Sequence, residues 1–144
     1  MVLTLCARNN EPGAAERAER ILMNIEKLHA EGLSDAVANS RCYSAAISAW
    51  ARSSSSNAVE RAFALIDRME KNGRDNTPHG KPNSHCYNAC IHAIAKSYQP
   101  GKERQCGEVL QRMIEAKDAG FHEAAPSLIT YSTIINGEYG IVKT

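Results

Sequence analysis

The chain has 144 residues, of which 43% are hydrophobic and 23% are charged, a balance that excludes an intrinsically disordered protein. Its apolar runs fall short of the ~18–20 residues that a membrane-spanning helix needs, so we expect no membrane insertion. The formal net charge of +1 excludes a strongly basic protein, so any binding of nucleic acid must depend on where the charges lie.

The sequence repeats itself. Tyr43, Tyr87 and Tyr131 follow one another at intervals of 44 residues, and many neighbouring positions match in type at the same interval. A fixed interval of this size is typical of proteins built from repeated supersecondary units.

Residues 1–39 are predicted to be the second half of a truncated repeat. Residues 3–8 align with the end of a first helix, and the turn-forming sequence at 9–13 follows them. We then expect a second helix that ends at Gly32, where glycine adopts a positive φ readily. The apolar face of this helix consists of Ala18, Ile21, Leu22 and Ile25.

Residues 40–83 are predicted to be a full repeat of two helices. Asn39 can cap the first helix with its side-chain oxygen, a serine turn at 53–56 separates the helices, and Gly73 ends the second. Both helices carry apolar residues three and four apart, which places them on one helix face. These residues are Tyr43, Ala46, Ile47 and Trp50 in the first helix and Ala62, Leu65, Ile66 and Met69 in the second.

Residues 84–127 are predicted to be a second full repeat with the same pattern. Asn83 is the expected cap of its first helix, the turn lies at 98–101, and Gly120 ends its second helix. The two apolar faces consist of Tyr87, Cys90, Ile91 and Ile94, and of Cys106, Val109, Leu110 and Met113.

Residues 128–144 are predicted to begin a further, truncated repeat, with Ser127 as the cap of its first helix. Terminal repeats of a finished array normally have a polar outer face, and the sequence shows none, so we expect a fragment of a longer protein.

Neither helix of a repeat can bury its apolar face alone, so each hairpin must stack on its neighbours. Ala18, Ala62 and Cys106 are small at the same position of every second helix, which allows close approach. The predicted fold is therefore all-α, an α-solenoid of stacked antiparallel helical hairpins with one layer of first helices and one of second helices.

The segments 40–52, 84–96 and 128–137 resemble the first helix of a pentatricopeptide repeat. Residues 62–73 and 109–120 resemble its second helix, and the dipeptides Pro-Asn and Pro-Ser that end at Asn83 and Ser127 match the close of the family's repeat. The repeats here are longer than is usual in the family, but the additional residues fall in loops, where extra length costs little closure entropy.

The resemblance implies binding of single-stranded RNA, with one base read per repeat by two side chains. One reader follows the tyrosine of the first helix and the other is the last residue of the repeat. Small polar side chains occupy all these positions, and the family's pairing rules imply adenine for the first full repeat and cytosine for the second. The pairs are Ser44 with Asn83 and Asn88 with Ser127, and the truncated repeats contribute Asn39 and Ser132.

The resemblance also implies contacts with neighbouring bases and with phosphates. Bases would stack on Arg41, His85 and Ile129. A cation that recurs late in each first helix would meet one phosphate per nucleotide; these cations are Arg8, Arg52 and Lys96. The alternatives are solvated side chains near a helix start, helix caps at Asn83 and Ser127, and cations favoured by the helix dipole.

The sequence indicates neither an enzyme nor a metal or cofactor site. Cys86, Cys90 and His92 lie near one another in sequence, but a closed zinc site needs four converging ligands. Cys90 falls on an apolar stripe, which favours a buried, reduced thiol. The five cysteines, Cys6, Cys42, Cys86, Cys90 and Cys106, include no Cys-x-x-Cys pair.

Single-stranded RNA is thus the expected partner, with no small-molecule substrate. The alternatives are a protein-binding helical scaffold, or the RNA-binding arm of a nuclease whose catalytic domain is absent from this chain. The resemblance implies RNA processing or expression in mitochondria or plastids, although the first residues show no targeting peptide.

Overall fold

The computed structural model describes residues 13–35, 37–53, 55–74, 81–97 and 100–138. These residues are all-α, with no strand among them, which confirms the all-α part of the predicted fold. None of the described helices combines the length and the apolar composition needed to cross a lipid bilayer. The elements are α2 (Ala14–Ala30), α3 (Ser40–Arg52), α4 (Ala58–Arg74), α5 (Ser84–Lys96), α6 (Lys102–Asp118), the 3-10 helix η1 (His122–Ala124) and α7 (Leu128–Glu138).

The helices begin at the positions that the repeat predicts. The first helices α3, α5 and α7 begin at Ser40, Ser84 and Leu128, and each start is 44 residues after the one before. The second helices α2, α4 and α6 begin at Ala14, Ala58 and Lys102, with the same interval. The period of the sequence is therefore also the period of the secondary structure.

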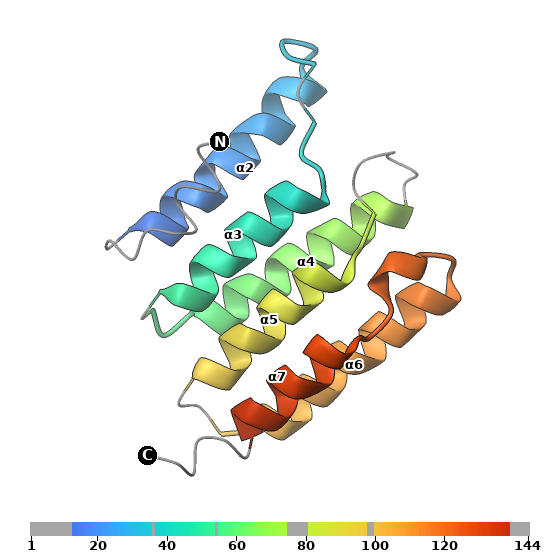
Figure 1. The fold of residues 1–144 in the computed structure, drawn as a ribbon. Helices are drawn as coiled ribbons and strands as arrows, with labels where there is room; N and C mark the ends of the chain where they lie inside the picture. Colours follow the sequence, from blue (N-terminus) through green and yellow to red (C-terminus); the bar gives the residue numbers. More distant parts are fainter. Residues whose placement is uncertain (1–12, 36, 54, 75–80, 98–99, 139–144) are drawn as a thin grey trace.

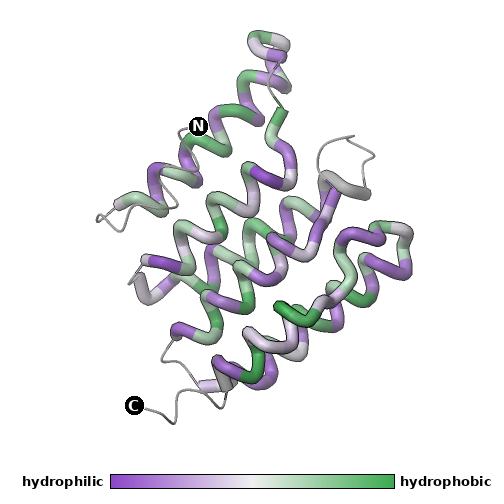
Figure 2. Tube along the Cα trace, in the orientation of Figure 1, coloured by the Kyte–Doolittle hydropathy of each residue, from purple (hydrophilic) through white to green (hydrophobic). Residues whose placement is uncertain are grey.

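The first helices lie side by side, with α3 against α5 and α5 against α7 (Figure 1). Each of α4 and α6 packs against the first helices that come before and after it in the chain, and α2 packs against α3. Figure 2 shows hydrophobic and hydrophilic positions alternating along the helices, as expected for helices with one buried side.

The core consists of the apolar stripes. Tyr43, Ile47, Tyr87 and Ile91 of the first helices are completely buried. The small residues Ala18, Ala62 and Cys106 are buried as well, which agrees with close approach of the helices at this position.

The helix ends agree with the predicted caps at Asn39 and Asn83 and with two of the three predicted glycine ends, while the cap predicted at Ser127 stays a prediction. The Asn39 side chain accepts a hydrogen bond from the Cys42 amide at 3.0 Å, and Asn83 accepts one from the Cys86 amide at 3.1 Å. Gly32 and Gly120 follow α2 and α6 with φ of 74° and 109°. The prediction for Gly73 was wrong, because α4 continues through it to Arg74; a glycine in a last turn can stay helical at a cost of only about 1 kcal/mol.

A glutamate joins three helices at each of the first two junctions between repeats. At one junction, Glu70 of α4 accepts a hydrogen bond from the Tyr87 hydroxyl of α5 at 2.8 Å, and Arg112 of α6 lies 3.8 Å from its other oxygen. Burial of Tyr87, followed by the charge and hydrogen bond of Glu70, raises the pKa of this phenol far above its ordinary value. The hydroxyl therefore stays protonated and remains a donor.

The same arrangement occurs one repeat earlier. Glu26 of α2 accepts a hydrogen bond from the Tyr43 hydroxyl of α3, and its other oxygen accepts one from Nε of Arg68 of α4 at 2.6 Å. Glutamate, tyrosine and arginine are each 44 residues before their counterparts at the next junction. We call each such set a junction triad.

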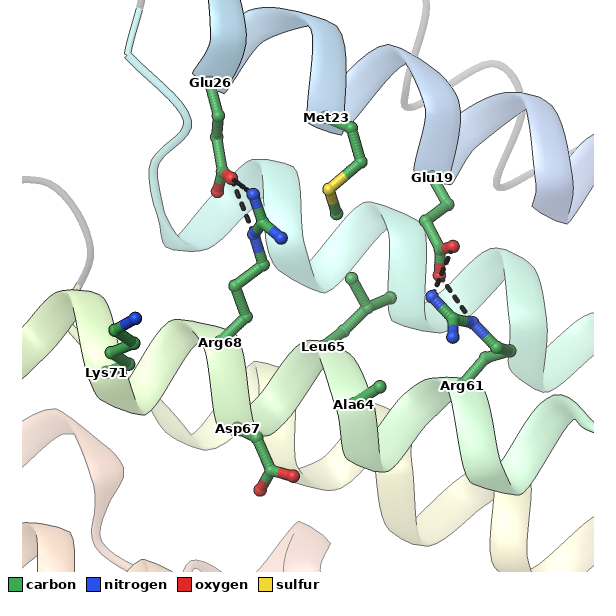
Figure 3. A pocket seen from close by; sticks show the side chains of 9 residues that line it. All are labelled: Glu19, Met23, Glu26, Arg61, Ala64, Leu65, Asp67, Arg68 and Lys71. Atoms are coloured by element: carbon green, nitrogen blue, oxygen red, sulfur yellow. Dashed lines mark hydrogen bonds and ion pairs between the residues drawn. The ribbon is translucent and has the colours of Figure 1, made fainter. Parts of the chain in front are cut away.

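A further carboxylate, Glu19, strengthens the junction of α2 with α3 and α4. It accepts hydrogen bonds from the Trp50 indole at 3.2 Å and from Arg61 at 2.6 Å. Figure 3 shows the pairs of Glu19 with Arg61 and of Glu26 with Arg68 bridging α2 and α4. The cleft between these helices has a volume of about 610 Å³ and is lined by both pairs, so long charged side chains span the space between the second helices.

Helix α7 differs from α3 and α5 because no second helix follows it among the described residues. Tyr131 and Ile135 are 46% and 56% exposed, whereas their counterparts Tyr87 and Ile91 are fully buried. Ile114 of α6 occupies the place of the triad glutamate before Tyr131. At the third junction, between α6 and α7, an apolar side chain therefore stands where the first two junctions have a glutamate.

The triad generates a prediction about stability. Glu70→Ala removes the acceptor of a buried tyrosine hydroxyl and one partner of Arg112, and an unsatisfied buried donor costs about 1–3 kcal/mol. We expect a loss of that size in the free energy of unfolding, measured by urea denaturation with circular dichroism. The control is Glu115→Ala on α6, where an exposed carboxylate accepts only the Gln111 amide at 3.2 Å.

The control should change the free energy of unfolding by no more than about 0.5 kcal/mol. The effects of Glu70→Ala and Tyr87→Phe should not be additive, because both remove the same hydrogen bond. Equal effects of Glu70→Ala and Glu115→Ala would show that the triad contributes nothing specific.

Candidate nucleic-acid interface

The first helices α3 and α5 differ in charge from the second helices. The sequences of α3 and α5 contain no aspartate or glutamate, and their only charged side chains are the cations Arg41, Arg52 and Lys96. The second helices hold the carboxylates of the triads, where arginines pair with them. A chain with a net charge of +1 thus has two first helices, α3 and α5, whose formal charge is purely positive, whereas the sequence of α7 contains Glu138 and no cation.

A cleft of about 340 Å³ crosses the first helices. Its lining comes from one face of each helix, because the contributing residues are spaced three and four apart. Five predicted RNA contacts line this one cleft, together with a histidine that the sequence analysis did not assign to RNA. Helix α3 contributes Ser44 and Arg52, α5 contributes His85, Asn88 and His92, and α7 contributes Ile129.

Asn88 and Ser127 are connected through Thr130. The Thr130 hydroxyl donates to the Asn88 side-chain oxygen at 2.7 Å, and it accepts a hydrogen bond from the Ser127 amide at 3.0 Å. The Ser127 hydroxyl lies 3.4 Å from the same oxygen of Thr130. Thr130 is fully buried, so it holds the two predicted readers of the second repeat in a fixed relation.

The two predicted base-reading residues at the helix starts, Asn39 and Asn83, cap their helices. The side-chain oxygens of Asn39 and Asn83 accept backbone hydrogen bonds from the third residue after them. Asn39 is exposed and Asn83 is half-buried, and neither lines the cleft. Since an asparagine cap uses only its oxygen, the amide donors of both side chains remain for a ligand.

The other predicted contacts lie outside the cleft lining. Arg41 is exposed near the start of α3, Lys96 is exposed at the end of α5, and Ser132 is exposed on α7. Arg8 lies outside the described residues, so its predicted contact with phosphate stays a prediction.

The charged side chains that act on the His92 imidazole, Lys96 and Arg52, are both cations. Partial burial lowers the pKa of its imidazole most, and the charges of Lys96 and Arg52 lower it further. The spacing of His92 along α5 is a signal that could have pointed to this residue. His92 follows Asn88 by four residues and precedes Lys96 by four, so the three lie on one helix face.

The described cysteines are buried, free thiols, as the sequence predicts for Cys42, Cys86, Cys90 and Cys106. Burial raises the pKa of Cys86 to about 12, and it raises the pKa of Cys90 further. Cys6 lies outside the described residues. No three histidine, cysteine or acidic side chains converge within the described part of the chain in a way that could hold a metal ion.

The raised thiol pKa values predict slow alkylation. At pH 8, a pKa of about 12 leaves about one thiol in 10⁴ as the reactive thiolate, about a thousandfold less than an ordinary exposed thiol. We expect Cys86 and Cys90 to stay unmodified by iodoacetamide in the folded protein and to react fully in urea. Peptide mass spectrometry measures both states. Rapid labelling of either residue with the helical signal intact would contradict the burial described here.

Comparison of the chain with protein-family models, with curated proteins and with solved structures found no match. Function is therefore inferred from the properties of the molecule itself: the repeat of 44 residues, the cleft across α3, α5 and α7, and the difference in charge between α3 and α5 and the second helices.

Proposed function

We propose that the chain is a pentatricopeptide-like α-solenoid of helical hairpins that binds single-stranded RNA along its first helices. One observation carries the proposal. Five of the residues that the family resemblance assigns to bases and to phosphate come from separate repeats, yet they line a single cleft. They are Ser44, Arg52, His85, Asn88 and Ile129.

The spacing of the helices supports recognition of one nucleotide per repeat. α3 packs against α5 and α5 against α7, so equivalent side chains of neighbouring repeats, such as Ser44 and Asn88 or His85 and Ile129, follow one another along the cleft. Unstacked bases can enter between the helices, where polar side chains form hydrogen bonds with base edges. Ser44 with Asn83 would read adenine, and Asn88 with Ser127 would read cytosine.

The charge distribution supports a nucleic-acid ligand over a neutral one. A phosphate backbone that follows α3 and α5 meets cations and no carboxylate of these helices. Such contacts release counterions and supply most of the sequence-independent affinity for RNA. By the family resemblance, the chain acts without catalysis in RNA processing or expression in mitochondria or plastids.

A protein-binding scaffold is the second candidate, and exposed apolar side chains of α7 favour it. Leu128, Tyr131 and Ile135 are 82%, 46% and 56% exposed, and a group of such side chains can bind another protein. A scaffold would show neither preference among oligonucleotides nor steep loss of affinity with salt.

The proposal is tested by the salt dependence of RNA binding. We expect affinity for single-stranded RNA to fall steeply as salt rises, with each phosphate contact contributing about 0.7 to the logarithmic slope. Arg52→Gln should lower the slope by about that amount. Arg20→Gln removes an exposed cation from α2, outside the cleft, and should leave the slope unchanged. Fluorescence anisotropy measures both, and absence of binding would overturn the proposal.

Base choice tests the assignment of Ser127. Ser127→Asp keeps a side chain that can cap α7 but replaces a hydroxyl by a group that only accepts hydrogen bonds. Uracil offers an N3–H donor where cytosine offers an acceptor. We therefore expect the preference at this base to move from cytosine towards uracil by about 1 kcal/mol, or roughly fivefold in relative affinity.

The matched control is Asn57→Asp, which introduces the same charge before the second helix α4. Competition between oligonucleotides that differ only at this base should detect the change for Ser127→Asp and none for Asn57→Asp. An unchanged preference in the Ser127 variant would exclude this residue as a reader without affecting the case for the fold.

A further inference from the structure

The side chain of Thr130 on α7 forms a hydrogen bond with Asn88 on the neighbouring helix α5. The Thr130 hydroxyl donates to Oδ1 of Asn88 at 2.7 Å, a length typical of an O–H···O hydrogen bond. The oxygen of the same hydroxyl accepts the Ser127 amide at 3.0 Å, so the hydroxyl hydrogen is the group that remains to be donated. The atom of the Asn88 amide that faces Thr130 is therefore its oxygen.

The burial of Thr130 determines which part of the Asn88 amide can face the cleft. Thr130 is fully buried, whereas Asn88 is half-buried and lines the cleft across the first helices. The oxygen and the nitrogen of a planar amide lie on opposite branches. An amide whose oxygen is held at a buried hydroxyl therefore directs its nitrogen away from that hydroxyl. The two N–H donors of Asn88 are the groups left for a ligand in the cleft.

The hydrogen bond also opposes rotation of the Asn88 amide into the reverse orientation. Such a rotation would turn the N–H groups towards Thr130, and the buried hydroxyl would lose its acceptor. The Ser127 hydroxyl oxygen lies 3.4 Å from Thr130 Oγ1, too far to replace the lost bond at equal strength. Because a buried donor without an acceptor costs free energy, Thr130 favours one orientation of the amide.

We infer that Thr130 is a positioning residue that selects cytosine over uracil at the second full repeat by holding the N–H donors of Asn88 towards the base. This inference rests on the proposed function and adds to it a buried residue that does not touch RNA. Cytosine presents two adjacent acceptors, N3 and O2, to these donors, whereas uracil presents an N3–H donor between two carbonyl oxygens. An asparagine that turns freely can serve either base, but one held by Thr130 cannot offer its oxygen to the N3–H group of uracil.

The first full repeat has no equivalent of this arrangement. Cys86 occupies the position of Thr130 there, and its thiol lies 3.2 Å from the Ser40 carbonyl oxygen of the α3 backbone. Ser44 occupies the position of Asn88, and a serine has no amide to orient. The selection of cytosine over uracil by an oriented amide is therefore expected at the second repeat alone. Cys86 also shows that the fold accommodates a thiol at this position.

The test measures the ratio of affinities for two short single-stranded RNAs that share an adenine and carry either cytosine or uracil at the next base. Thr130→Val removes the hydroxyl with little change in volume, and Thr130→Ser retains it. The matched control is Thr133→Val on the same helix, because the Thr133 hydroxyl donates to the Ile129 carbonyl and not to a predicted base-reading residue. Circular dichroism verifies folding, and Thr130→Cys, the residue of the preceding repeat, serves if the valine variant loses helix.

We expect the ratio of cytosine to uracil affinity to fall about fivefold in Thr130→Val, as for the loss of one hydrogen bond, and to be retained in Thr130→Ser and Thr133→Val. In a background of Asn88→Ala, Thr130→Val should not change the ratio further, because Thr130 acts only through Asn88. The preference for adenine at the preceding base should stay as in the wild type. A general loss of stability would instead lower the affinity for both RNAs alike.

An unchanged ratio in a folded Thr130→Val protein, or an equal fall in Thr133→Val, would overturn this inference and leave the proposed function intact. The same holds for a wild type that binds both RNAs with equal affinity. Absence of wild-type binding to either RNA would overturn both the inference and the proposed function.

Discussion

At its first two junctions, the fold depends on a carboxylate that is shared between a tyrosine and an arginine. Glu70 belongs to α4, and its partners Tyr87 and Arg112 belong to the two helices of the next repeat. Apolar contact alone would let neighbouring hairpins slide or rotate, because it has no direction. A half-buried carboxylate that accepts the tyrosine hydroxyl and lies beside an arginine has direction, and so favours one register and one distance between repeats.

The position of the triad carboxylates also determines how charge is distributed between the first and the second helices. The triads need carboxylates on the second helices, and the arginines opposite them neutralise those carboxylates locally. α3 and α5 contribute only the tyrosine hydroxyl to a triad, so no acidic residue is needed on them. Their cations therefore face solvent and the cleft without local compensation from the same helix. The stability of the junctions and the lack of carboxylates on α3 and α5 therefore follow from the same placement of acidic side chains on the second helices.

The sequence predicted the helices well because apolar periodicity and capping residues are local signals. It located the starts of the helices and the caps at Asn39 and Asn83. It missed the triads, although Glu26 and Glu70 repeat at the same interval as the tyrosines, because charged residues on a helix usually face water. The helix end predicted at Gly73 was wrong, because a glycine near the end of a helix is compatible with both a helical and a non-helical backbone. The link from Asn88 through Thr130 to Ser127 could not be predicted, because it depends on the packing of α7 against α5.

The hydrogen bonds from Thr130 to Asn88 and from Ser127 to Thr130 make the two full repeats differ in how their predicted base-reading residues are held. Thr130 lies in the following repeat, so the pair of Asn88 and Ser127 is held partly by a neighbour. In the first full repeat the corresponding position is Cys86, whose thiol is within hydrogen-bonding distance of the Ser40 carbonyl at 3.2 Å. A hydroxyl directs a side-chain amide far more strongly than a thiol does. The side chains that read a base in such an array would therefore depend on the repeat that follows, and base preference would be a property of junctions as much as of single repeats.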